Sequence, residues 1–298
     1  MPSGAGLAGI FVCAKHELMR SSCQSLVHSN MNESPERTRR VQFRDTSFVV
    51  EPMDRGQREF WDRFEAVAWE PETLSILKAG LDRRTTFIDI GSWIGPTALF
   101  AAAHARRVIA LEPDPLALRQ LRRNIALNPE LASRIQVLGR ALYNKTGVVT
   151  LGSTKRGGDS KSSIVHDDMR TAWEVETITP SELASAIADD ERVFIKIDIE
   201  GGEYDVGPQL RPLLCSQTVA VLLSLHPKLI VGQARGVDRL KRLVRVARAT
   251  NDLFAAFDGF AFHEARSVSS LRRPDIERLV RWGLCYRPLG GTWLLTRE

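Results

Sequence analysis

The sequence predicts an α/β fold: a doubly wound, mostly parallel sheet with an antiparallel edge. Short, unbroken apolar runs alternate with segments of helical period, as in parallel sheets whose two faces are covered by helices. A glycine turn follows the first run, in "TTFIDIGSWIG", where such folds bind ligands. Near the carboxyl end, "LFAAFDGFAFHE" and "CYRPLGGTWLLTRE" are strand-like and joined by one helix, which predicts the antiparallel edge.

Residues 1–45 are expected to be a disordered leader, because the polar stretch "SSCQSLVHSNMNESPERTRR" has no sustained hydrophobic period. Residues 46–298 are expected to form a single domain, since 298 residues that are 43% hydrophobic can bury one large core. The domain begins with a helical N-terminal segment, "REFWDRFEAVAWEPETLSILKAGL", which Pro71 divides into two helices.

The elements that follow are predicted in chain order from their hydrophobic period. Apolar runs predict strands at Thr85–Ile90, Val108–Leu111, Ile135–Leu138, Val193–Ile197 and Val219–Leu225. Helical spacing predicts one helix that ends at Ala103 and another over "PLALRQLRRNIALN". The Gly- and Ser-rich stretch "GSTKRGGDSKSSI" lies between two β-like runs and predicts a flexible loop, a candidate lid.

The charge pattern does not favour a nucleic-acid partner. The net charge is +5, but 36 acidic residues are interspersed with 41 basic ones. Much of the surplus is arginine on a predicted helix over residues 235–249, whose Val237, Leu240, Val244 and Ala247 lie at helical spacing. This pattern indicates a solvated amphipathic helix, and no nucleic-acid-binding motif is recognised.

The apolar runs and the cysteines predict a cytoplasmic protein without a membrane span. No apolar run approaches the ~20 residues that cross a bilayer, and the amino end lacks the features of a signal peptide. The four cysteines lie far apart without a C-x-x-C pair: Cys13, Cys23, Cys215 and Cys285. They predict free thiols rather than disulfides or a zinc site.

The first candidate site is a cofactor pocket at the glycine turn, with Asp89, Gly91 and Gly95 at the end of the first strand. The Gly-Lys-Ser/Thr of a phosphate loop is absent, and Trp93 stands where the dinucleotide fingerprint needs glycine. Asp89 suits an ammonium group, and Glu112, about 20 residues beyond the turn, suits the two ribose hydroxyls. The pair predicts S-adenosyl-L-methionine as the cofactor. The alternatives are that Asp89 caps a helix and that Glu112 is a surface acid.

The second candidate site is the charged stretch "KIDIEGGEYD", which holds Lys196, Asp198, Glu200 and Glu203 at the end of a strand. Alternation sets the first three on one strand face, where charges need a ligand or one another. We interpret Asp198 as lying beside the methyl group and the other three as substrate-side or rim residues. Two alternatives stay open: a structural ion-pair cluster around Lys196, and a divalent cation on Asp198 and Glu200, although no metal is expected.

A candidate base follows the next strand, where "LLSLHP" ends in His226 and Pro227. Methylation of an alcohol requires removal of its proton, and neutral histidine is the usual base near neutral pH. His226 is therefore predicted as the general base, with Asp198 as the second candidate catalytic residue.

Four motifs together resemble the FkbM family of class I methyltransferases that use S-adenosylmethionine: "FIDIGSWIG", "ALEPD", "RALYNKTGVVTL" and "VFIKIDIEGGEYDV". The resemblance runs from about Trp69 to the end of the chain, and the last motif is the most specific. It implies a Rossmann-like seven-stranded domain that methylates, typically, hydroxyl oxygens of sugars or secondary metabolites. It also implies that Arg140 and Ala141 lie at the adenine ring. Family members often carry an acid two residues before the histidine, where this chain has Ser224.

The expected function is O-methylation of a small hydroxylated metabolite or a glycan. N-methylation is the alternative within the same class of enzyme. A binding module that kept the fold without catalysis is the alternative outside that class, and Ser224 is the feature that favours it.

Overall fold

The computed structural model of the protein describes residues 38–153, 157–158, 162, 170–187, 192–215, 217–232, 235–265, 270–271 and 291–297. The strands are β1 (Arg39–Phe43), β2 (Thr46–Val50), β3 (Thr85–Ile90), β4 (Arg107–Leu111), β5 (Ile135–Leu138), β6 (Ala141–Leu142), β7 (Val148–Ser153), β8 (Thr171–Ile178), β9 (Arg192–Ile197), β10 (Thr218–Leu225), β11 (Phe260–Glu264), β12 (Ser270–Leu271) and β13 (Gly291–Arg297). The helices are α2 (Arg55–Glu65), α3 (Pro71–Gly80), α4 (Pro96–His104), α5 (Pro115–Ala126), α6 (Pro129–Ala132), α7 (Pro180–Ala184), α8 (Glu203–Val206), the 3₁₀ helix η1 (Gly207–Leu213), α9 (Pro227–Val231) and α10 (Gly236–Ala255).

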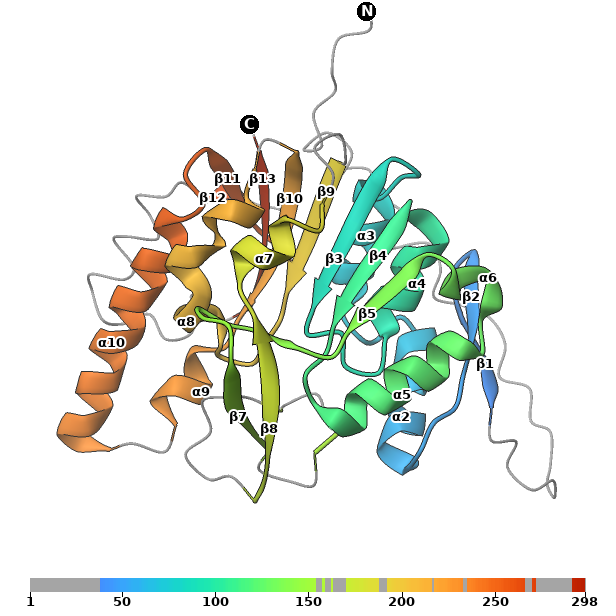
Figure 1. Cartoon of the computed structure of the whole chain (residues 1–298), viewed down its shortest axis with the longest axis horizontal. Helices are drawn as coiled ribbons and strands as arrows, with labels where there is room; N and C mark the ends of the chain where they lie inside the picture. Colours follow the sequence, from blue (N-terminus) through green and yellow to red (C-terminus); the bar gives the residue numbers. More distant parts are fainter. Residues whose placement is uncertain are drawn as a thin grey trace, which may run out of the picture.

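The central sheet has the strand order β12-β11-β13-β10-β9-β3-β4-β5 (Figure 1). The strands from β10 to β5 are parallel, and β13 lies antiparallel between β10 and β11. The predicted seven-stranded, mostly parallel sheet with an antiparallel edge is confirmed, and the two-residue strand β12 extends that edge. A small sheet of β6, β8 and β7 stands apart from it.

Side-chain alternation along the strands divides the core into two layers. In β3, Phe87 packs in the layer that holds α3 and α4, whereas Ile88 and Ile90 pack in the layer that holds α8, η1 and α10. In β9, Phe194 belongs to the first layer and Ile195 to the second. Lys196 follows Phe194 by two residues, so its side chain faces the layer of α3 and α4.

The N-terminal segment forms α2 and α3. Asp54 begins α2 by accepting a hydrogen bond from the backbone N–H of Gln57 (2.8 Å), as an N-cap residue does. Pro71 occupies the first turn of α3, where its missing N–H leaves no hydrogen bond unmade.

The ordered structure begins earlier than predicted. Residues 39–45 were expected in the leader, but they form β1 and the turn to β2. Val41 and Phe43 are buried and alternate with less buried residues, and Phe43 packs edge-on against Phe64 and Phe100. This strand is too short for its alternation to stand out beside the polar residues that precede it. Residues 1–37, the rest of the predicted leader, lie outside the described residues.

Deletion of residues 1–37 is expected to leave the melting temperature unchanged, because that stretch has no core-forming pattern. Deletion of residues 1–45 is the matched control, since it also removes β1 and the pairing of Arg39 with Asp62 and Glu65. The loss of two large buried side chains should lower the free energy of unfolding by roughly 3–6 kcal/mol. Thermal denaturation of both truncations measures the difference, and an equal loss in both would show that residues 1–37 pack on the domain.

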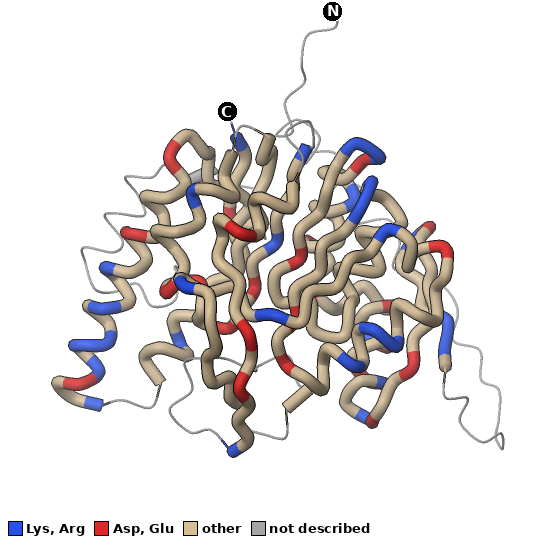
Figure 2. Tube along the Cα trace, in the orientation of Figure 1, with Lys and Arg blue, Asp and Glu red and all other residues tan. Residues whose placement is uncertain are grey.

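Helix α10 extends beyond the predicted helix at its C-terminal end. It includes residues 253–255, which were assigned to a strand, and β11 begins only at Phe260. Its buried residues are Val246, Thr250, Leu253 and Phe254. The first part of the predicted apolar spacing, Val237, Leu240 and Val244, is exposed, and basic residues recur along the same helix (Figure 2). Residues 272–290, where one helix was expected before β13, lie outside the described residues.

In the described ranges, no helix has the length and apolar composition that a bilayer span requires. Cys215 is a free thiol, as predicted. The other three cysteines lie outside the described residues.

Candidate active site

The predicted site residues converge where β3, β4 and β9 end, at the carboxyl edge of the parallel strands. A cleft opens there. Six predicted residues line it: Gly91, Glu112, Arg140, Ala141, Asp198 and Glu200. Its apolar wall comes from Ile90, Leu111, Leu142 and Leu151.

The two glycines of the turn serve different purposes, and both have left-handed backbone. A Cβ atom on Gly91 would lie 1.9 Å from the carbonyl oxygen of Asp198, so the missing side chain lets the turn touch the chain beyond β9. A Cβ atom on Gly95 would lie 2.7 Å from a methyl carbon of Leu121. Gly95 therefore allows α4 and α5 to pack closely, and it is not among the residues that line the cleft.

Glu112 is a buried acid that lines the cleft, not a surface acid; its exposed fraction is 6%. Its Oε1 accepts the N–H of Asp114 (2.8 Å), and its Oε2 accepts the N–H of Trp93 (2.7 Å). Burial raises the pKa of Glu112 to about 8, although these two hydrogen bonds act in the opposite direction. A carboxylate held in this way retains lone pairs for two further donors, such as a ribose diol.

The affinity for 5′-methylthioadenosine, which carries the ribose without an amino-acid group, is expected to rise with pH. Two ribose hydroxyls can both donate to Glu112 only when its carboxyl group is ionised. Below about pH 8 that group is protonated, so binding must release its proton. The affinity then weakens by up to about tenfold per pH unit. Glu112→Gln should bind ~1–3 kcal/mol more weakly, without this pH dependence. Calorimetry from pH 6 to 9 measures both effects, and a parent affinity that is flat with pH would contradict the assignment.

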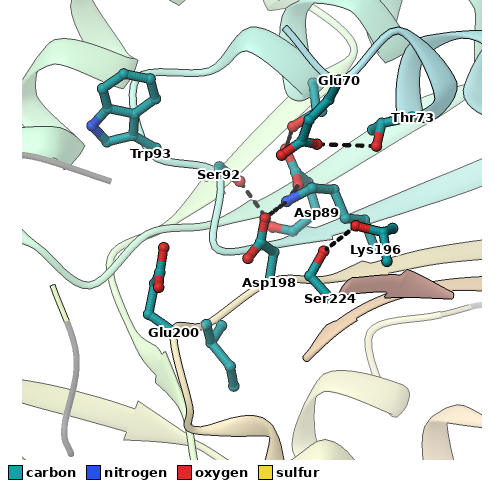
Figure 3. Close-up of polar contacts among 12 residues, drawn as sticks. Glu70, Thr73, Asp89, Ser92, Trp93, Lys196, Asp198, Glu200 and Ser224 are labelled. Carbon is teal, nitrogen blue, oxygen red and sulfur yellow. Dashed lines mark hydrogen bonds and ion pairs between the residues drawn. The ribbon is translucent and has the colours of Figure 1, made fainter. Parts of the chain in front are cut away.

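A buried ammonium group joins the ends of β3 and β9 (Figure 3). The Nζ atom of Lys196 lies 3.3 Å from Oδ2 of Asp198 and 3.7 Å from Oδ1 of Asp89. Burial opposes both charges, but their attraction outweighs it: the pKa of Lys196 lies above and that of Asp198 below the usual value. The ion-pair cluster that stood as an alternative is therefore present, and Lys196 lies beneath the site rather than at its rim.

Asp89 lies below the cleft and has no exposed surface. Its Oδ2 accepts a hydrogen bond from the hydroxyl of Thr97 in α4 (2.7 Å), and burial raises its pKa. Gly95, not Asp89, is the N-cap residue of α4. Direct contact between Asp89 and a ligand ammonium group is not supported by this geometry, because Asp89 does not line the cleft.

Glu70 is a site residue that the sequence did not reveal. It precedes α3, accepts a hydrogen bond from Thr73 (3.0 Å), and lies close to Lys196 in Figure 3. Burial and the nearby Asp198 raise its pKa, against the attraction of Lys196. Glu72, the acid two residues later, opens α3 instead. The local sequence gives no signal for Glu70, because its approach to Lys196 depends on how α3 packs against the sheet.

His226 follows β10 and is surrounded by three carboxylates. Its Nδ1 lies 3.0 Å from Oε1 of Glu203, and its Nε2 lies 3.5 Å from Asp198 and 3.7 Å from Glu200. Burial lowers the pKa of His226, but the hydrogen bond to Glu203 and the three negative charges outweigh it and raise the pKa to about 9. This environment therefore favours the protonated ring near pH 7, and the role of His226 as a base stays a prediction.

Glu203 was predicted at the rim, but it is completely buried. Its Oε1 accepts the N–H of Ile199 (3.0 Å) and its Oε2 that of Gly201 (2.8 Å). These bonds close the turn after β9, and the same carboxylate orients the ring of His226. Glu203 therefore holds the ring of the candidate base His226 in position through its Nδ1 atom.

Asp198, Glu200 and His226 offer one ligand atom each within 4.8 Å of one another, an arrangement that can hold a metal ion. A proton on Nε2 of His226 competes with such an ion. The expectation of a metal-free site stays a prediction.

Arg140 and Ala141 both line the cleft, and their role at the adenine ring stays a prediction. Arg140 reaches Glu176 (3.2 Å) beside the cleft, and Ala141 is buried in β6. Ser224 lies on β10 and shares a hydrogen bond with Thr292 of β13 (3.2 Å). The position where an acid was expected from the resemblance therefore makes a contact within the sheet.

Comparison with protein families finds a match to the Methyltransferase FkbM domain over residues 89–226. A search of curated proteins finds no significant match.

Three solved structures are similar in part. A methyltransferase FkbM from Methylobacillus flagellatus KT is 18% identical, with a TM-score of 0.42 over 72% of this chain and 44% of that chain. The precorrin-6y C5,15-methyltransferase from Geobacter metallireducens GS-15 is 14% identical, with a TM-score of 0.36 over 76% and 87%. The plantazolicin methyltransferase BamL, in complex with a triazolic desmethylPZN analog and SAH, is 9% identical, with a TM-score of 0.36 over 82% and 91%. The chain spans less than half of the first of these structures.

Proposed function

We propose that the protein is an O-methyltransferase that uses S-adenosyl-L-methionine as the methyl donor and acts on a hydroxyl of a small metabolite or a glycan. The match of residues 89–226 to the Methyltransferase FkbM domain is the premise of this proposal. The observation that carries the proposal is the setting of His226. Glu203 fixes its Nδ1 from behind, and its Nε2 is directed toward Asp198 and Glu200, which line the cleft. A ring nitrogen oriented by a buried carboxylate is the arrangement of a general base.

The residues of the cleft fit the proposed cofactor. S-adenosylmethionine supplies an electrophilic methyl group on a sulfonium ion. Glu112 offers a carboxylate for the ribose, and Arg140 and Ala141 border the same cleft beside its apolar wall. Asp198 presents a partly exposed carboxylate, 21% of its side chain, on the side of His226. A negative group there suits a positively charged sulfur.

The raised pKa of His226 sets the conditions for proton transfer. The ring is charged near neutral pH in the free protein, and a further positive charge in the cleft lowers its pKa because like charges disfavour each other. The neutral Nε2 then accepts the proton of the acceptor hydroxyl as its oxygen attacks. Asp198 and Glu200 stabilise the imidazolium that results, and the fixed geometry supplies much of the rate.

N-methylation is the second candidate, because the carboxylates of Asp198 and Glu200 would also attract an amine acceptor in its ammonium form. Calorimetry with S-adenosylmethionine, followed by turnover on hydroxylated compounds and their amino analogues, tests both candidates. Turnover restricted to the amines would replace the first proposal by the second. Binding without turnover on either panel favours a module without catalysis. Loss of turnover with a chelator, and recovery with Mg²⁺, would show that the carboxylates hold a cation.

A further inference from the structure

A closed ring of hydrogen bonds joins the cofactor turn to the connection between β7 and β8. The N–H of Trp93 donates to Oε2 of Glu112 (2.7 Å), and the N–H of Asp114 donates to Oε1 (2.8 Å). The N–H of Gly158 donates to Oδ2 of Asp114 (2.7 Å), and the indole Nε1–H of Trp93 donates to the carbonyl of Gly158 (2.9 Å). The hydroxyl of Ser162 donates to the same Oδ2 of Asp114. The proposed ribose acceptor and this connection therefore belong to one network.

Trp93 is an unusual residue for the backbone it adopts. Its φ is +48°, in the left-handed region that glycine and asparagine enter readily and bulky residues avoid. The hydrogen bond to Glu112 uses only the backbone, so glycine or asparagine would make it with less strain. The indole must therefore contribute something that offsets the strain. It packs edge-on against Phe60 at 4.6 Å and binds Gly158.

Two residues that line the cleft have such backbone. Among the described residues, five non-glycine residues have positive φ, and two of them, Trp93 and Glu200, line the cleft. Strained backbone persists where the surrounding structure holds it in place. The side chain of Trp93 reaches from the cofactor turn to Gly158.

We propose that Trp93 is a positioning residue that couples ligand binding at Glu112 to the placement of Gly158 and of Ser162. The inference rests on the proposed function, because it takes Glu112 as the ribose acceptor. Ser162 lines the cleft together with Glu112 and Asp198, so its placement helps to shape the cleft.

The physical link is the charge of Glu112. Ribose hydroxyls that donate to Glu112 favour its ionised form, and N–H groups that donate to a carboxylate make stronger bonds than those to a neutral acid. The bonds from Trp93 and Asp114 then tighten together. Because both residues also hold Gly158, its placement is stabilised when the ligand binds, and by thermodynamic reciprocity the converse also holds.

Limited proteolysis tests the coupling, with S-adenosylhomocysteine as the probe. Trypsin sites at Lys155, Arg156 and Lys161 flank Gly158, and mass spectrometry follows cleavage there. Trp93→Phe keeps an aromatic ring and removes the indole donor. Trp69→Phe is the matched control, because Trp69 packs edge-on against the same Phe60 at 5.1 Å.

In the parent, the probe should slow cleavage at these sites. In Trp93→Phe, cleavage without the probe should be about 2- to 10-fold faster, the effect of one lost hydrogen bond on local opening, and most of the protection by the probe should disappear. The fold loss of affinity for the probe, measured by calorimetry, should not exceed the fold loss of protection from cleavage. Trp69→Phe should behave as the parent.

Two results would overturn the inference: parent-like cleavage of Trp93→Phe with and without the probe, or equal acceleration in Trp69→Phe. If the parent does not bind the probe, the cofactor pocket is wrong, while the comparison without the probe still decides whether Trp93 holds Gly158. The two failures are therefore distinguishable.

Discussion

Replacement of His226 by alanine is expected to slow methyl transfer by about 10²–10⁴-fold, the usual contribution of a general base, with little change in cofactor affinity. The fold should survive, because Glu203 keeps its hydrogen bonds from Ile199 and Gly201. His226→Asn is a second variant, whose amide is able to donate to Glu203 in place of Nδ1. Turnover and cofactor binding of both variants, measured side by side, separate catalysis from folding.

The pH profile gives an independent test of the same role. The pKa of His226 in the free protein is raised to about 9, so kcat/KM of the parent should increase as the pH rises from 7 toward 9. The alanine variant should lack this rise. His263→Ala is the matched control, since His263 pairs with Thr296 on the antiparallel edge of the sheet. Unimpaired turnover of His226→Ala from pH 6 to 9 would exclude the base.

Replacement of Lys196 by methionine is expected to lower the free energy of unfolding by roughly 3–5 kcal/mol, the usual result of removing one partner of a buried ion pair. The side chain is 5% exposed and lies between Asp198 and Asp89. Without the ammonium group, two buried carboxylates would face each other. Denaturant unfolding at pH 8 measures the loss, and Lys196→Arg, which keeps the charge, should lose less.

The sign of the pH dependence distinguishes an electrostatic loss from a packing loss. In the parent, the pKa of Asp198 is lowered, so its ion pair contributes stability at higher pH that fades as the carboxylate is protonated. The difference between parent and Lys196→Met should therefore shrink as the pH falls below 3.8, the ordinary pKa of an aspartate side chain. Lys78→Met removes a more exposed pair with Asp45 and should cost less than about 1 kcal/mol. A Lys196→Met protein as stable as the parent at pH 8 would contradict this account.

The sequence was sufficient to predict the sheet and the position of the cleft. Each of the five predicted parallel strands ends at the residue where the observed strand ends, for example Ile90 and Ile197. The reason is that an apolar run gives way to glycine or charge where a parallel strand emerges from the core. Parallel strands share one carboxyl edge, so Gly91, Glu112 and Asp198 were bound to lie close together.

The burial of individual side chains and their long-range contacts were not predictable in this way. Alternation along a strand tells which face a side chain takes but not what covers that face. Lys196 and Asp89 lie beneath α3 and α4, and Glu203 lies behind His226, because of helices packed over them. Glu70 enters the cluster from a helix that begins more than a hundred residues before β9, and no local pattern records such a meeting.

The contact between Gly91 and Asp198 limits which parts of the protein can change independently during evolution. The backbone of the glycine turn touches the carbonyl of Asp198, and the N–H of Asp198 donates to the carbonyl of Ile90 (3.0 Å). Neither segment can shift without the other, so a lineage that acquires a new methyl acceptor cannot do so by remodelling the chain at Asp198 alone. Inherited variation in specificity should therefore accumulate outside these two segments, while the turn and the Asp198 backbone stay fixed together.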